Sequence, residues 1–346
     1  MLAAAALVFA GGVAIGAFVS DRLDRTPKTV VSELAVPPVT EPRPAPAAPV
    51  ALEPIPQELP TLGPSPTEAL EESEPDVVAP RKPVEQPQWL RNAVAAPEAD
   101  GRPLIAIVID DLGLSGEKVR RTAALPAPLT LAFLPYANGL SELTAVARAR
   151  GHELLVHVPM EPGSRTTDPG PNALLTEYGV RDLLSRIEWN LGRLDGYVGI
   201  NNHMGSRFTA DPSGMAVVLS ELNRRGLMFL DSRTSAKTVG DKLARTIGLP
   251  SVERDVFLDP DGARSDVAGQ LVELERTARR QGYAVGIGHH YNVTLDTLEG
   301  WLDTLEERGF VLAPISAIAK LRIAREERAL AAIRPNAVDL GVASRP

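Results

Sequence analysis

The 346-residue sequence predicts an α/β fold, and three observations support this class. Short apolar runs recur through residues 103–322, each about as long as a buried strand. Patterns with helical periodicity separate the runs, as in folds where each strand is followed by a helix. Apolar residues make up 44% of the chain, which is enough for a substantial core and excludes a wholly disordered protein. The alternation predicts a parallel sheet, either open or closed into a barrel.

The first predicted strand, residues 104–109, reads LIAIVI. An apolar run without polar alternation is typical of a parallel strand that is buried on both faces. Six further runs have the same character and complete a set of seven predicted strands. They lie at residues 129–134, 153–158, 197–200, 227–230, 284–287 and 310–312.

Five helices are expected between these strands, because apolar residues recur there at helical spacing. They cover residues 141–150, 180–194, 213–225, 265–281 and 295–308. A charged helix over residues 324–333 and a polar tail come last. We therefore expect a folded domain over residues 103–322 and a separate appendage over residues 323–346.

The amino-terminal segment, residues 1–20, contains no charged residue and is long enough to cross a bilayer as a helix. We interpret it as an uncleaved membrane anchor. A cleaved signal peptide is the alternative, but the apolar run is long for one and no clean small-x-small cleavage site ends it. Arg22, Arg25 and Lys28 follow the run, and the positive-inside rule taken alone would put the carboxyl-terminal side in the cytoplasm.

A proline-rich segment follows, and we expect residues 27–100 to form a disordered linker. Residues 27–97 contain 17 of the 31 prolines and seven carboxylates between residues 53 and 76. Such a composition cannot build a core and behaves as an extended spacer.

Composition excludes several classes of function. The chain has 36 Lys and Arg against 44 Asp and Glu, so its net charge of −8 argues against a general nucleic-acid binder. It has no cysteine, which excludes disulfides, thiolate nucleophiles and cysteine-ligated zinc. The GxSxG motif of many serine hydrolases and the glycine-rich phosphate loops are also absent.

Polar residues follow the predicted strands at their carboxyl ends, the edge where α/β folds bind ligands. Asp110 and Asp111 end the first strand. Two adjacent carboxylates at a buried position are costly unless they are paired or bind a metal, so we favour a functional role. As a pair of glycosidase carboxylates they are less suitable, because adjacent residues rarely flank a sugar from opposite faces.

The third strand, in GHELLVHVPMEP, ends at His157, and Glu161 lies four residues further on. His152 lies at the opposite end of this strand and is expected to be structural. The fourth strand leads into GINNHMGS, which contains His203. One carboxylate and two imidazoles at neighbouring strand ends, with open positions, suit zinc or another divalent metal in a catalytic site.

Two later strands also end in polar residues. Asp231 follows LMFL and begins DSRTS, and His289 follows AVGIG. A histidine in the second position could deliver a proton to a leaving group. The adjacent His290 is expected to point elsewhere.

In order along the chain, the motifs IVIDDLG, TLAFLP, GHELLVHVPMEP, GINNHMGS, FLDSRTS and GIGH resemble the divergent polysaccharide deacetylase family, which is related to the carbohydrate esterase family four deacetylases. The resemblance covers about two thirds of the chain. It implies a distorted (β/α) barrel of about seven parallel strands, and a divalent metal, usually zinc.

The resemblance also implies roles for individual residues. Asp110 corresponds to the general base and Asp111 to a metal ligand, while His289 corresponds to the general acid. Asp231 resembles a later carboxylate that orients a catalytic group. The family pattern has two metal-binding histidines four residues apart. His157 matches the first, but the second position is Glu161, so we assign His203 as the third ligand.

The function implied is a metal-dependent hydrolase that removes acetyl groups, by amide or ester hydrolysis, from an envelope polysaccharide such as a peptidoglycan-like glycan. The anchor would hold the chain in the inner membrane with the catalytic domain in the periplasm, and the linker would give it reach. A catalytically weak or inactive glycan-binding protein is the alternative, because the second histidine of the pattern is missing. A cytoplasmic sugar hydrolase is a third.

Overall fold

The computed structural model describes residues 86–333. The predicted anchor, residues 27–85 of the predicted linker and residues 334–346 of the predicted tail lie outside this range. Among the described helices, none combines the length and the apolar character needed to cross a membrane.

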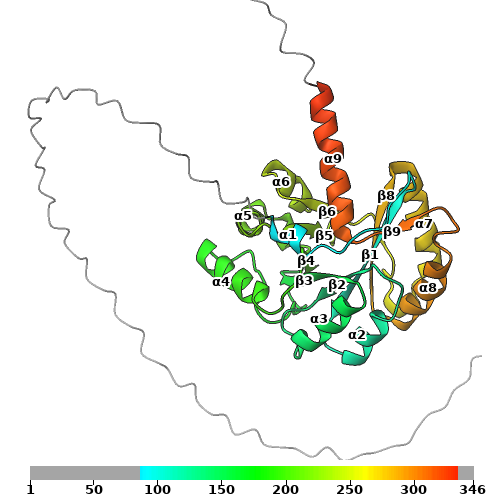
Figure 1. Cartoon of the computed structure of the whole chain (residues 1–346). Helices are drawn as coiled ribbons and strands as arrows, with labels where there is room; N and C mark the ends of the chain where they lie inside the picture. Colours follow the sequence, from blue (N-terminus) through cyan, green and yellow to red (C-terminus); the bar gives the residue numbers. More distant parts are fainter. Residues whose placement is uncertain (1–85, 334–346) are drawn as a thin grey trace, which may run out of the picture. The chain divides into compact units, whose positions relative to one another are not determined.

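A single curved sheet forms the centre of the described region (Figure 1). Its nine strands pair in parallel throughout, in the order β6-β5-β4-β3-β2-β1-β8-β7, with β9 paired to β1. The strands are β1 (Leu104–Leu112), β2 (Thr130–Phe133), β3 (Glu153–Met160), β4 (Gly199–Met204), β5 (Met228–Asp231), β6 (Ser251–Glu253), β7 (Val256–Phe257), β8 (Tyr283–His289) and β9 (Val311–Leu312).

The sheet curls into a barrel, because its two edge strands are consecutive in the sequence. Only Arg254 and Asp255 separate β6 from β7. Three Cα–Cα steps of about 3.8 Å bring the end of β6 to within about 11 Å of the start of β7. No hydrogen-bonded strand pair joins these two edges in the described region, so the barrel is distorted and open along this seam.

Helices follow most of the strands, and most of them lie around the outside of the sheet (Figure 1). They are α1 (Gln88–Arg91), α2 (Gly116–Thr122), α3 (Leu140–Ala149), α4 (Val180–Leu191), α5 (Pro212–Arg225), α6 (Gly240–Thr246), α7 (Val267–Gln281), α8 (Asn292–Asp303) and α9 (Ile315–Ile333). Two short 3₁₀ turns, η1 (Phe208–Ala210) and η2 (Gly262–Arg264), lie in loops.

Side chains on the two faces of the sheet enter two different cores. On β1, Ile105, Ile107 and Ile109 pack outward against the helices. Ala106 and Val108 point into the barrel, whose interior also contains Ile315 and Ile318 of α9 and Trp89 of α1. The main-chain N–H groups of Ile315 and Ser316 bond to Thr130 and Glu153 at the amino-terminal ends of β2 and β3, so α9 closes that end of the barrel.

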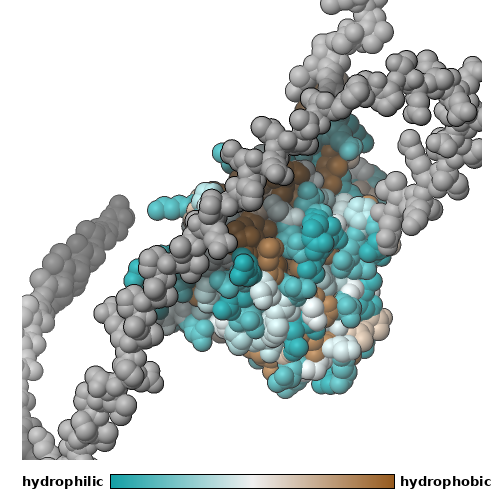
Figure 2. All heavy atoms as spheres, turned by 90° about the vertical axis from the view of Figure 1, so that its left-hand side faces the viewer, coloured by the Kyte–Doolittle hydropathy of each residue, from teal (hydrophilic) through white to brown (hydrophobic). Residues whose placement is uncertain are grey.

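The outer surface of the described region is mostly polar. In Figure 2, hydrophilic colours cover much of the face turned to the viewer, and brown areas are interspersed with them. Exposed apolar side chains include Val180 and Leu184 of α4. The described domain therefore buries most of its large apolar residues in the two cores.

The predicted fold class is confirmed, and each of the seven predicted strands corresponds to an observed one. The prediction missed β6 and β7, which have three and two residues, and α2 and α6, which have seven each. Helices of two turns show too little periodicity to be recognised, but length alone does not explain the missed strands, because β9 also has two residues and was predicted.

The predicted boundaries of the folded region differ from the observed ones at both ends. Residues 86–100 were assigned to the linker, but α1 packs on the barrel and Trp89 is only 5% exposed. At the other end, α9 runs without a break through the expected boundary after residue 322. The first residues of α9 belong to the barrel interior, whereas its later residues are charged. Only the charged part was recognised from the sequence as a separate helix.

Candidate metal and catalytic site

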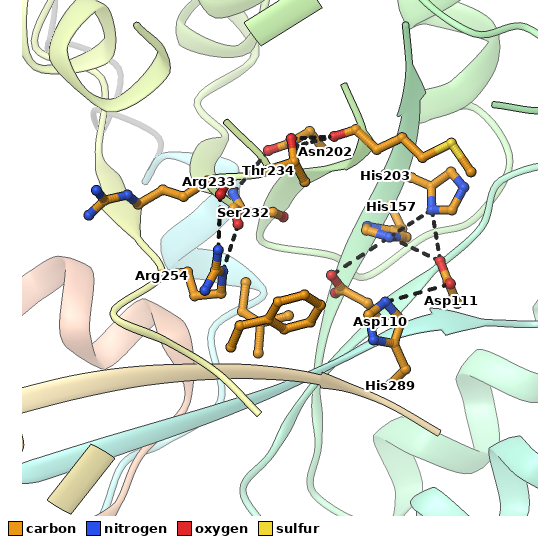
Figure 3. A pocket seen from close by; sticks show the side chains of 13 residues that line it. Asp110, Asp111, His157, Asn202, His203, Ser232, Arg233, Thr234, Arg254 and His289 are labelled. Atoms are coloured by element: carbon orange, nitrogen blue, oxygen red, sulfur yellow. Dashed lines mark hydrogen bonds and ion pairs between the residues drawn. The ribbon is translucent and has the colours of Figure 1, made fainter. Parts of the chain in front are cut away.

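A cavity of about 380 Å³ opens at the carboxyl ends of the strands, and predicted site residues from four strands line it (Figure 3). β1 supplies Asp110 and Asp111, β3 supplies His157, β4 supplies His203 and β8 supplies His289. Parallel strands all end at this edge, so residues up to 179 positions apart in the sequence meet here.

A bulge in β1 lets both adjacent carboxylates face the cavity. In a regular strand, Asp110 and Asp111 would point to opposite faces of the sheet. The pairing of β1 with β2 changes register between Ile109 and Leu112, and Asp111 has a positive φ of 61°. Asp110 continues the inward row of Ala106 and Val108, and the bulge turns Asp111 toward the same space.

Three donor atoms form a compact triangle in this cavity. Oδ1 of Asp111 lies 2.8 Å from Nδ1 of His203 and 3.2 Å from Nε2 of His157. The two imidazole nitrogens are 3.3 Å apart. Zinc bonds of about 2.0–2.1 Å in a tetrahedral arrangement separate neighbouring ligand atoms by about 3.3 Å. The triangle therefore has the size of one face of a zinc coordination shell, and its donor set of two nitrogens and one oxygen suits a catalytic zinc.

The electrostatics of the triangle also favour a cation. Oδ1 of Asp111 is buried and has no hydrogen-bond partner within the described structure, although two imidazoles lie beside it. Burial raises the pKa of Asp111, but His157 and His203 outweigh burial and hold it well below its ordinary value. Burial lowers the pKa of His157, whereas the charges of Asp110 and Asp111 raise it further than burial lowers it. The residues present thus fit a bound divalent metal.

Asn201 holds a metal-ligand candidate and a carboxylate at the same time. Its Oδ1 lies 2.8 Å from Nδ1 of His157, which leaves Nε2 of that ring to face the triangle. Its Nδ2 donates to Oδ1 of Asp110 at 2.8 Å. Burial raises the pKa of Asp110, and the nearby His157, His289 and Asn201 oppose this effect without cancelling it.

His289 is positioned by Asp259, a residue that the sequence reasoning missed. Nδ1 of His289 lies 2.9 Å from Oδ1 of Asp259, and its main-chain N–H donates to Oδ2 at 2.6 Å. The hydroxyl of Thr294 donates to the same Oδ2. Nε2 is left facing the cavity, 3.7 Å from Oδ2 of Asp111. Burial lowers the pKa of His289, but the hydrogen bond with Asp259 and the charges of the nearby carboxylates raise it to about 9.

The structure does not bring Asp231 into this cluster. On β5, Met228 and Leu230 point into the barrel, so Asp231 points to the opposite face. Its carboxylate accepts hydrogen bonds from the hydroxyl of Thr238 and the N–H of Arg233, both in the loop after β5. The carboxylate that contacts His289 is therefore Asp259 and not Asp231. The sequence does contain a feature that could have identified Asp259, because it ends the short apolar run VFLD. Asp231 ends a similar run, FLD.

Glu161, which the resemblance matched to a second metal-binding histidine, also lies outside the triangle. Its Oε2 accepts hydrogen bonds from the N–H and hydroxyl of Thr176, and its Oε1 lies 3.3 Å from Nε of Arg207. His152 is structural, as predicted: its two ring nitrogens contact the N–H of Leu129 and the carbonyl of Ala123.

Three residues around the cavity have a strained backbone. Asp111, Met204 and Arg233 line it, and their φ angles are 61°, 52° and 50°. Residues other than glycine adopt this left-handed region rarely, and such strain concentrates at functional sites. The strain supports a functional interpretation of this end of the barrel.

Comparisons with known proteins find similar chains that are uncharacterized. The chain is 35% identical over 205 residues to an uncharacterized protein of Haemophilus influenzae, a match that covers 59% of this chain and 72% of the relative. It is 34% identical over 207 residues to the uncharacterized Escherichia coli protein YibQ, covering 60% of this chain and 64% of that protein, less than two thirds of its length.

One solved structure is similar over most of the folded region. It is the crystal structure of the uncharacterized protein ATU2773 from Agrobacterium tumefaciens, with a TM-score of 0.64, 31% sequence identity, and coverage of 67% of this chain and 95% of that chain. Residues 107–319 match the model of one family, described as divergent polysaccharide deacetylase. These residues include every strand-end group described above, and the chain belongs to the divergent polysaccharide deacetylase family.

Proposed function

We propose that this protein is a zinc-dependent deacetylase, which hydrolyses an acetyl amide or ester on an envelope polysaccharide. The observation that carries the proposal is the convergence of a metal-sized donor triangle, a buried carboxylate and a cationic histidine in one cavity. An alternative role, such as a pair of glycosidase carboxylates, would explain only some of these groups. Membership of the deacetylase family supports the same reaction class.

Asp111, His157 and His203 would hold the metal. A bound divalent ion would polarise the acyl carbonyl and lower the pKa of the attacking water. The role of Asn201 is then to hold the ring of His157 in the tautomer whose Nε2 faces the ion. The two nitrogens and one oxygen favour zinc over magnesium or calcium, which prefer oxygen donors.

Asp110 is the general base in this proposal. It removes a proton from the water that attacks the acyl carbon, and burial makes it a stronger base than an exposed aspartate. Asn201 fixes its Oδ1, so Oδ2 remains for the proton. Asp111 has a different task, because its Oδ1 belongs to the donor triangle.

His289 is the general acid. With its pKa near 9 it carries a proton at neutral pH, and Nε2 faces the cavity where the leaving group would depart. Asp259 holds Nδ1–H and keeps the ring in this orientation. His289 gives its proton to the sugar nitrogen or oxygen as the bond to the acyl carbon breaks.

The location in the cell remains part of the proposal. We propose that residues 1–20 anchor the protein in the inner membrane and that residues 27–85 are a spacer, which would put the domain in the periplasm beside its glycan. Reporter fusions at the carboxyl terminus test this orientation. We expect that only a reporter that works in the periplasm will be active. If only a reporter that works in the cytoplasm were active, the proposed orientation would be wrong.

The direct test of the reaction is acetate release from an N-acetylated glycan by the purified full chain. We expect release with zinc, loss of release after chelation, and recovery when zinc is added back. Wild-type protein that binds zinc and glycan but releases no acetate would contradict the enzyme proposal. That outcome would favour the glycan-binding alternative.

A further inference from the structure

Arg254 lies in the wall of the same cavity and has an unusual set of contacts. It belongs to the two-residue connection between β6 and β7. Its Nε donates to the carbonyl of Ser232 at 2.7 Å and its Nη2 to the carbonyl of Arg233 at 2.9 Å. The guanidinium lies 4.9 Å from the centre of the Phe257 ring. Its Nη1 has no hydrogen-bond partner among residues 86–333.

The charge of Arg254 is not balanced by direct contact with a carboxylate. Within the described residues, no Asp or Glu oxygen lies within 4.0 Å of its guanidinium, whereas the adjacent Arg233 pairs with Glu253 at 3.5 Å. Burial lowers the pKa of Arg254, but a guanidinium remains charged at any physiological pH. The carboxylates of Asp110, Asp231 and Asp255 act on this charge only from beyond contact distance. A partly buried cation without a directly bound counter-ion is unfavourable, so it points to an anionic partner that arrives from outside.

The contacts of Arg254 leave room for such a partner. If Arg254 only stabilised the loop after β5, this role would explain its two hydrogen bonds to main-chain carbonyls. It would not explain why the guanidinium also faces the cavity. Arg254 lines the cavity together with Asp110 and His289. In Figure 3 it lies across the view from the cluster of Asp111, His157 and His203. A sugar held between the two walls would present one substituent to each.

We propose that Arg254 binds an oxyanion, namely a carboxylate carried by the acylated sugar itself. This inference rests on the proposed function of the same cavity, because it assigns the opposite wall to the reacting acetyl group. Guanidinium groups bind carboxylates and phosphates through short, charge-assisted hydrogen bonds. The protein then selects acidic N-acetylated glycans over neutral ones.

Binding to the metal-free full chain tests this inference without requiring any turnover. The probes are an oligosaccharide of N-acetylglucosamine and N-acetylmuramic acid, its methyl ester, and a neutral chito-oligosaccharide of equal length, measured by calorimetry in chelator. We expect the free acid to bind about tenfold or more tightly than either neutral probe. Equal affinities for the acid and its methyl ester would overturn the proposal, and this comparison needs no variant.

Variants then assign the preference to Arg254. In Arg254→Gln the preference for the acid should disappear, while Arg254→Lys should keep part of it. Arg279→Gln is a matched control, because Arg279 also lies over a phenylalanine ring, that of Phe310, and donates to a carbonyl, but away from the cavity. A preference that survives in Arg254→Gln, or a uniform loss of affinity for acid and ester alike, would contradict the inference.

Two further measurements complete the test. One asks whether the oxyanion belongs to the sugar or is a free ion, and the other asks whether the site depends on the proposed reaction. Free acetate and inorganic phosphate should compete weakly. If either bound as tightly as the acidic glycan, the site would hold a free ion and the proposal would be wrong. Acetate release with zinc is measured separately on acid and ester. No release from either, with the binding preference intact, would remove the proposed reaction but not the oxyanion site.

Discussion

The two ends of strand β3 carry buried polar side chains with opposite kinds of bonding. At the amino-terminal end, His152 and Glu153 are fully buried, and the protein satisfies both. The two nitrogens of His152 contact main-chain groups. The carboxylate of Glu153 accepts hydrogen bonds from the N–H and hydroxyl of Ser316 and from the N–H of Val94.

At the carboxyl-terminal end, only half of the ring of His157 is bound in this way. Asn201 holds Nδ1, while Nε2 faces Oδ1 of Asp111 and Nδ1 of His203. These three atoms converge on one point and are all suited to bind a cation. This contrast separates structural from functional polar groups: a buried polar group that is fully hydrogen-bonded within the protein stabilises the fold, whereas several polar groups that converge on one point indicate a ligand.

The largest expected effect comes from removing a donor from this point of convergence. In Asp111→Gly we expect acetate release to fall to background, a loss of more than about 10⁴-fold. Glycine tolerates the left-handed backbone at residue 111, so the fold should be retained. The assay is acetate release, with the urea unfolding midpoint as the control. A variant that folds normally and keeps one tenth of the wild-type rate would remove Asp111 from the site.

Asp110→Asn tests the base without touching the triangle. We expect kcat to fall by about 10²–10⁴-fold while zinc content stays at the wild-type level. The amide keeps the shape of the side chain but cannot take a proton from water. Zinc content and kcat are measured on the same preparation, and full turnover in this variant would show that another group is the base.

Asp259→Asn and Asp231→Asn form a matched pair of strand-end carboxylates. In Asp259→Asn we expect kcat to fall by about 10–100-fold, because His289 loses the partner that orients it. In Asp231→Asn we expect a change in kcat of less than about twofold and a loss of stability of about 1–3 kcal/mol, because its loop contacts are weakened. Reversed effects on kcat would restore Asp231 to the catalytic role predicted from the sequence.

Glu153→Gln tests the closed end of β3 and should give the smallest effect on activity. An amide cannot accept all three hydrogen bonds that the carboxylate accepts, so we expect unfolding to become easier by about 1–3 kcal/mol. Zinc content and kcat per folded molecule should not change. Urea unfolding measures the first quantity. A drop in zinc content would show that the two ends of the strand are not independent.

Much of this site could be predicted from the sequence, because Asp110, Asp111, His157, His203 and His289 each follow an apolar run. Parallel strands end at one edge, so position along the chain was enough to bring these five residues together. Seven of the nine described strands were visible for the same reason. Each of the seven overlaps a continuous apolar run, whereas β6 and β7 lie in SVERDVFLD, where charged residues interrupt the apolar run.

The rest of the site depends on features that a sequence does not display. Asp231 and Asp259 both end an apolar run, and only the direction of each side chain from the sheet separates them. Phe229 and Leu230 are equally apolar, so the pattern does not reveal which face of β5 is inward. The bulge at Asp111 could not be predicted either, because two consecutive aspartates do not indicate a change of strand register.

The measurement that tests the central claim most directly is the metal content of the purified full chain after zinc is supplied, by elemental analysis, for wild type, His203→Ala and Glu161→Ala. We predict stoichiometric zinc in wild type, loss in His203→Ala, and no change in Glu161→Ala, whose carboxylate is bound to Thr176 and Arg207 instead. Zinc that survives in His203→Ala but is lost in Glu161→Ala would contradict the triangle of Asp111, His157 and His203. Wild-type protein without zinc would contradict the metal site altogether.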